Sequence, residues 1–157
     1  MTDRKPPGEF ADEKATLAGF LDYLRDAIAA KVDGVPEPQV RAPGVLSGTS
    51  LLGLIKHLTF VERYYFLGAE VRSWPATFKP TGKDTTESVL AGYRQTITEA
   101  NAVIASYDDL TQAAPKPAQR GSAPSMRWLL THMIEETGRH AGHADIIREQ
   151  IDGATGR

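Results

Sequence analysis

Hydrophobic side chains recur at steps of three and four residues in four segments of the chain, a spacing that puts them on one face of an α-helix. The first segment runs from about Phe10 to Val32, and Gly34 and Pro36 follow it as helix-ending residues. Its apolar face consists of Leu17, Phe20, Leu21, Leu24 and Ile28. We therefore predict a first helix over about 10–32.

Two further helices are predicted in the middle of the chain. One opens at Thr49 or Ser50, whose side chain can cap the free backbone N–H groups, and continues to about Leu67. The other spans about 85–107, where Thr85 gives a weaker capping signal. Both carry an apolar face at helical spacing, so both are expected to pack into a common core.

The fourth segment carries the most informative pattern. It opens at Ser125, a good N-cap residue, and runs to about Ile151 before Gly153. Its apolar face reads Leu129, Met133, Glu136, His140, Ala144, Ile147 and Ile151. Glu136 and His140 thus occupy core-facing positions in an otherwise apolar row, where an ionisable group needs a compensating partner.

The connections between these segments, about 33–49, 68–84 and 108–124, are longer than the roughly 2–8 residues usual between bundle helices. Such connections can cross the end of the bundle or its full length, so a simple up-down-up-down order is not assured. No segment alternates as a strand does, and the prolines of the connections also disfavour strands. We predict an all-α four-helix bundle with long crossover connections, forming a single domain over 1–157 with its core at about 10–153.

Composition narrows the functional classes. The formal net charge is −2 and the basic residues are scattered, which disfavours nucleic-acid binding. No apolar run is long enough for a membrane span, and the N-terminal residues lack the apolar core of a signal peptide, so we expect a cytoplasmic protein without a membrane partner. Because the chain has no cysteine, any metal must be held by nitrogen and oxygen ligands.

A metal ion is one way to compensate the ionisable pair of the fourth helix. Glu136 and His140 are four residues apart, so their side chains lie one above the other and can converge on a point. His57 lies beside the apolar face of the second helix and supplies a candidate third ligand. Three protein ligands would leave a tetrahedral ion with one open position, which is typical of a catalytic site.

Other interpretations of these residues stay open. A Glu and a His four apart are often a solvated, hydrogen-bonded couple rather than metal ligands. His132 and His143 lie near the same face and compete with His57 for the third position, or else support the ligands from a second layer. Arg139 and Arg148 could bind an anion, but exposed basic residues on helices are usually solvated, and we assign neither a role.

Two stretches carry a resemblance to a known family. They are SLLGLIKHLTFVERYYF and LLTHMIEETGRHAGHADIIREQIDG. They resemble the DinB-like (YfiT-like) superfamily of metal-binding four-helix bundles, and the similarity extends over about 10–153. The resemblance implies a metal triad of His57, Glu136 and His140, and it favours His57 over the other two candidate histidines.

Many members of that superfamily have His where this chain has Glu136, and Arg where it has Ala141. The Glu version resembles the mycothiol-dependent maleylpyruvate isomerase branch. We expect zinc, and because a carboxylate shifts the ligand set toward harder ions, nickel, manganese and iron are alternatives.

The resemblance also implies a function. Characterised relatives are transferases or isomerases that use a low-molecular-weight thiol such as mycothiol or bacillithiol. We therefore expect a divalent-metal-dependent enzyme that activates such a thiol towards a small carbon electrophile, such as an epoxide, an alkyl halide or an unsaturated acid. The alternatives are a metal-dependent hydrolase and a non-catalytic homodimeric bundle stapled by the metal.

Overall fold

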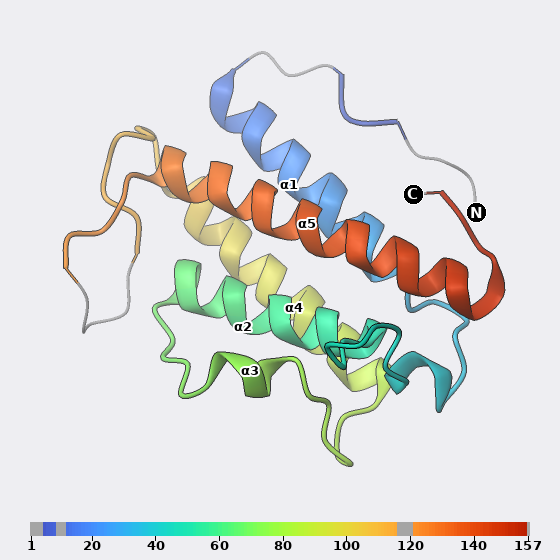
Figure 1. Ribbon diagram of the computed structural model, residues 1–157. Coiled ribbons are helices and arrows are strands. Elements are labelled where there is room, and N and C mark those ends of the chain that lie inside the picture. Colours follow the sequence, from blue (N-terminus) through green and yellow to red (C-terminus); the bar gives the residue numbers. More distant parts are fainter. Residues whose placement is uncertain (1–4, 9–11, 116–120, 157) are drawn as a thin grey trace.

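The computed structural model describes residues 5–8, 12–115 and 121–156 (Figure 1). The elements, in chain order, are α1 (Glu13–Ala30), a 3-10 turn η1 (Gln39–Arg41), α2 (Leu51–Leu67), α3 (Trp74–Thr77), α4 (Thr86–Ala105) and α5 (Met126–Asp152). The described part contains no strand, and its one isolated β-bridge joins Ala113 to Ser125. The prediction of an all-α helical bundle is confirmed. Within the same residues, no helix is both long and apolar enough to span a bilayer.

Side-chain caps set the starts of the long helices. Asp12, Ser50 and Ser125 each accept a hydrogen bond from the backbone N–H three residues further on. Thr85 and Ser88 form a reciprocal capping box, which is a stronger signal than the sequence pattern indicated. The predicted starts of the second and fourth helices are therefore confirmed.

The first and third helices are shorter than predicted. Helix α1 begins at Glu13, and the expected starting residue, Phe10, lies outside the described residues. It ends at Ala30 rather than Val32 because the backbone N–H groups of residues 31–33 bond three residues back instead of four, which tightens the chain into turns. Helix α4 ends at Ala105, two residues before the predicted end, with similar three-residue turns after it.

The helices are not arranged in simple up-down order. Helix α1 packs along α5, and α2 packs along α4. The contacts of α2 with α5 and of α1 with α4 are less extensive. In Figure 1, α1 and α5 run in one direction and α2 and α4 run in the other. Because α2 and α4 are parallel, the connection over 68–85 must return the full length of the bundle. This return carries α3 along the outer side of α2.

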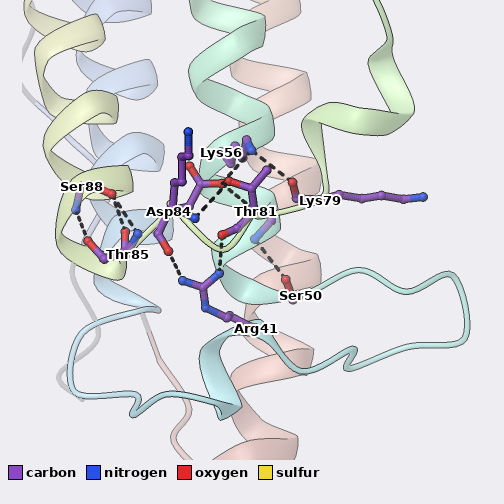
Figure 2. A network of polar contacts seen from close by, with 10 residues as sticks. Arg41, Ser50, Lys56, Lys79, Thr81, Asp84, Thr85 and Ser88 are labelled. Atoms are coloured by element: carbon purple, nitrogen blue, oxygen red, sulfur yellow. Dashed lines mark hydrogen bonds and ion pairs between the residues drawn. The ribbon is translucent and has the colours of Figure 1, made fainter.

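A polar network fastens this returning connection to α2 (Figure 2). The carboxylate of Asp84 accepts hydrogen bonds from Lys56 Nζ at 2.9 Å and from the hydroxyl of Thr81 at 2.8 Å. The guanidinium of Arg41 donates to the backbone carbonyls of Thr81 and Asp84. Since Lys56 precedes His57, the network anchors the connection beside the first candidate ligand.

Candidate metal centre

The three predicted ligands lie together where α2 faces α5. Each of His57, Glu136 and His140 offers one ligand atom, and these atoms all lie within 4.8 Å of one another. His140 Nε2 is 3.1 Å from Glu136 Oε1, and His57 Nε2 is 3.4 Å from the same oxygen. We call these three residues the His–Glu–His cluster.

The cluster is part of the lining of an open cavity of about 400 Å³. Both imidazoles are buried, whereas the carboxylate of Glu136 is partly exposed towards the cavity. Hydrogen bonding with the imidazole of His140 lowers the pKa of Glu136, so its carboxylate is ionised at neutral pH. A small molecule entering the cavity therefore meets two imidazoles and one carboxylate.

Thr77, on α3, fixes which nitrogen of His57 carries the proton. Its hydroxyl donates to the backbone carbonyl of Trp74 at 2.6 Å, and His57 Nδ1 is 2.7 Å from the same hydroxyl oxygen. A hydroxyl has a single proton to donate, and a carbonyl can only accept, so His57 Nδ1–H must be the donor to Thr77. Neutral His57 therefore presents the lone pair of Nε2 to the cluster.

This tautomer places two hydrogen-bond acceptors face to face. Burial lowers the pKa of His57, which favours its neutral form, and the Nε2 lone pair then faces the ionised oxygen of Glu136. His140 Nδ1 is also buried and has no hydrogen-bond partner among the described residues. A cation between the three ligand atoms would relieve the repulsion between Nε2 and the carboxylate, so the residues present fit a divalent metal.

The residues around α3 shape the cavity next to His57. The ring of Phe78 stacks on His57 with centroids 3.7 Å apart and planes 14° apart, and Trp74 meets the same imidazole edge-on at 6.0 Å. The backbone carbonyl of Phe78 lies against Gly53 of α2, where no Cβ interferes. Stacking and close backbone contact together hold the orientation of the His57 ring.

The two competing histidines also line the cavity but stand apart from the cluster. His132 stacks on Trp128 with centroids 4.9 Å apart and meets Tyr65 edge-on at 5.1 Å. His143 is exposed, and its ring centroid lies 6.1 Å from that of His140. Both remain candidates for supporting positions.

Sequence reasoning did not find Thr77 and Phe78, because a helix of four residues is too short to show periodicity. The available signal was Ser73 followed by Pro75, a pattern typical of a helix start. The sequence pattern also gave no reason to assign a role to Arg139, which the structure places in the cavity lining.

Fold and cluster together define a four-helix-bundle protein with a candidate nitrogen and oxygen metal centre in the lining of an open cavity. The chain belongs to the mycothiol S-transferase family, whose family model matches residues 16–153. That range includes the whole His–Glu–His cluster, and the match confirms the resemblance to DinB-like proteins and to mycothiol enzymes. A search of curated proteins finds no match to the chain.

Proposed function

We propose that this protein is a divalent-metal-dependent transferase that joins a low-molecular-weight thiol, of the mycothiol or bacillithiol type, to a small electrophile. His57, Glu136 and His140 would hold the ion. The observation that carries the proposal is the convergence of His57 Nε2 and His140 Nε2 on one carboxylate oxygen of Glu136, at 3.4 Å and 3.1 Å, in the lining of an open cavity. Membership of the mycothiol S-transferase family supports the thiol as co-substrate.

The ligand set suits zinc, with nickel, manganese or iron as alternatives, since two imidazoles and one carboxylate bind all of these ions. When bound, the ion would supply positive charge that lowers the pKa of a thiol next to it and so favours the nucleophilic thiolate. The chain has no cysteine, so the reacting thiol must come from solution. We assign the reaction to the cytoplasm, where reducing conditions keep small thiols reduced.

The protein's own residues would orient and shield the reactants. Thr77 keeps the Nε2 atom of His57 available, and Phe78 and Trp74 provide an apolar surface that excludes water from the reacting atoms. In the transfer, the thiol sulfur forms a bond to the electrophilic carbon. The leaving group departs with the pair of electrons from its broken bond, and the thiol proton passes to solvent.

Monochlorobimane is a suitable test electrophile, because C–S bond formation with loss of chloride makes it fluorescent. Metal-loaded protein would be assayed with mycothiol, bacillithiol, glutathione and cysteine, each at about millimolar concentration, a range that covers typical substrate KM values. We expect at least one thiol to react faster than in the protein-free control. Removal of the metal or His57→Ala should abolish the gain, and added metal should restore it in the metal-free wild type. If bound metal is verified and no thiol reacts above background, the transferase proposal is wrong.

A further inference from the structure

The cavity above the His–Glu–His cluster has two unlike walls. Val61 and Tyr65 of α2, with Trp74 and Phe78 from the returning connection, make one wall mainly apolar and aromatic. The facing wall belongs to α5, and beyond the cluster it consists of His132, Arg139 and His143. A ligand that fills the cavity would therefore contact apolar surface on one side and hydrogen-bond donors on the other.

Arg139 is the permanent charge on the α5 wall, and no described residue pairs with its guanidinium. Four other arginines pair with carboxylates, namely Arg25, Arg41, Arg127 and Arg148. Among the described residues, the guanidinium of Arg139 makes no hydrogen bond and no ion pair. Arg72 and Arg94 also lack a partner there, but neither lines this cavity.

Of the described residues that line the cavity, Glu136 is the only carboxylate, and it forms no hydrogen bond or ion pair with Arg139. Arg139 follows Glu136 by three residues, so its side chain leaves α5 next to the cluster. A guanidinium presents a rigid fork of donors that matches a carboxylate in two parallel hydrogen bonds.

We infer that the electrophilic substrate is a small organic carboxylate with an apolar body, held by Arg139 through its carboxylate while its reactive carbon faces the cluster. This inference rests on the proposed function for its reaction. The binding of the carboxylate is inferred separately, from the composition of the two walls and from the unpaired guanidinium. We assign the negative charge to the electrophile, whose carboxylate would lie at Arg139 while the sulfur of the thiol lies at the cluster.

A matched pair of alkylating reagents tests the inference. Iodoacetate and iodoacetamide share a leaving group and differ in charge, and the chain has no cysteine for them to modify. With one fixed thiol, the sulfur forms a bond to the methylene carbon, iodide leaves with the bonding electrons, and the thiol proton passes to buffer. For each reagent, the rate with protein is divided by the rate without protein, which gives one rate ratio per reagent.

We expect this ratio to be about tenfold larger for iodoacetate, as charge-assisted hydrogen bonds of ordinary strength allow. Arg139→Gln should lower the iodoacetate ratio about tenfold and change the iodoacetamide ratio less than about twofold. Arg94→Gln, an exposed control on α4, should change neither. Equal ratios for the two reagents, or an equal loss of both in Arg139→Gln, would overturn the inference.

A binding measurement separates this inference from the proposed function. Calorimetric titration of the metal-loaded protein would compare 3-phenylpropionate with 3-phenylpropionamide. We expect the acid to bind about tenfold more tightly in the wild type and about equally in Arg139→Gln. An acid preference that persists in Arg139→Gln would assign the carboxylate to the metal and contradict the role of Arg139. If neither alkylating reagent reacts above background, the proposed function fails, and this titration still decides the inference.

Discussion

The backbone carbonyl of Phe78 lies so close to Gly53 that a Cβ at residue 53 would stand 2.3 Å from the carbonyl oxygen. Gly53 is one turn before His57 on α2, and the Phe78 ring stacks on that histidine. The close approach of the returning connection to α2 therefore helps to position a candidate metal ligand.

Gly53→Ala should destabilise the protein and displace Phe78 from His57. The new methyl group must push the carbonyl away, at a cost of about 1–3 kcal/mol for overpacking. Gly92→Ala on α4 is the matched control, because a Cβ there meets nothing within 4 Å. Gly92→Ala should leave the free energy of unfolding unchanged or raise it by up to about 1 kcal/mol. Urea denaturation of both variants measures the difference, and equal stabilities would show that the contact with Phe78 is dispensable.

Arg25 and Glu62 form a second structural relationship, inside the bundle. Arg25 Nε donates to Glu62 Oε1 at 2.7 Å and Arg25 Nη2 donates to Oε2 at 2.6 Å, with both side chains buried. Glu62→Ala leaves the guanidinium without its buried counter-charge, so we expect a loss of about 3–5 kcal/mol in the free energy of unfolding. The double variant Arg25→Met with Glu62→Leu should recover much of that loss. A neutral Glu62→Ala would disprove the importance of the pair.

Asp84 should make stability depend on pH in the acid range. Burial alone would raise its pKa, but hydrogen bonds from Thr81 and Lys56 together lower the pKa of Asp84 from 3.8 to about 2. A carboxylate whose pKa is lowered on folding stabilises the protein fully above its unfolded pKa, and this contribution is lost as the pH falls from about 4 towards 2. Between pH 5 and pH 2 the wild type should lose about 2 kcal/mol more than Asp84→Asn does. Urea denaturation measures the free energy of unfolding of both proteins across this range. If it falls by the same amount in the wild type and in Asp84→Asn, this role of Asp84 is wrong.

Much of the fold and of the cluster follows from local sequence signals. Ser50 and Ser125 mark helix starts because a hydroxyl can accept from the free N–H groups of the first turn. Glu136 and His140 stand out because ionisable groups interrupt an apolar row. These signals depend only on residues within about one helical turn, which explains why the sequence alone reveals them.

The surroundings of His57 could not be predicted in the same way. The bond from His57 to Thr77 crosses 20 residues of chain, and it exists because α2 and α4 run parallel and force the connection to return along α2. The direction of each helix depends on how all four helices pack together, and the spacing of apolar residues along the sequence does not reveal it. The free guanidinium of Arg139 likewise becomes apparent only when every nearby carboxylate has been located in space.

Thr77→Val tests the proton position on His57. Valine keeps the shape of threonine but removes the hydroxyl that accepts from Nδ1–H, so the Nε2–H form, which can donate to Glu136, should gain population. Long-range nitrogen–proton correlation spectra of the metal-free protein measure the tautomer directly. We expect Nδ1–H in the wild type and in Thr77→Ser. Metal affinity should fall about 10–100-fold in Thr77→Val and return in Thr77→Ser. A wild-type His57 that carries its proton on Nε2 would disprove this role of Thr77.

The metal content of protein purified without chelator or affinity metal tests the central claim most directly. Elemental analysis should find about one divalent ion per chain in the wild type, because three ligand atoms form one site. The ion should be absent from His57→Ala and His140→Ala, mainly retained in His132→Ala and His143→Ala, and retained in Glu136→His. Wild-type protein that is metal-free and binds no added divalent ion, or loss of the ion in His143→Ala but not in His57→Ala, would contradict the account.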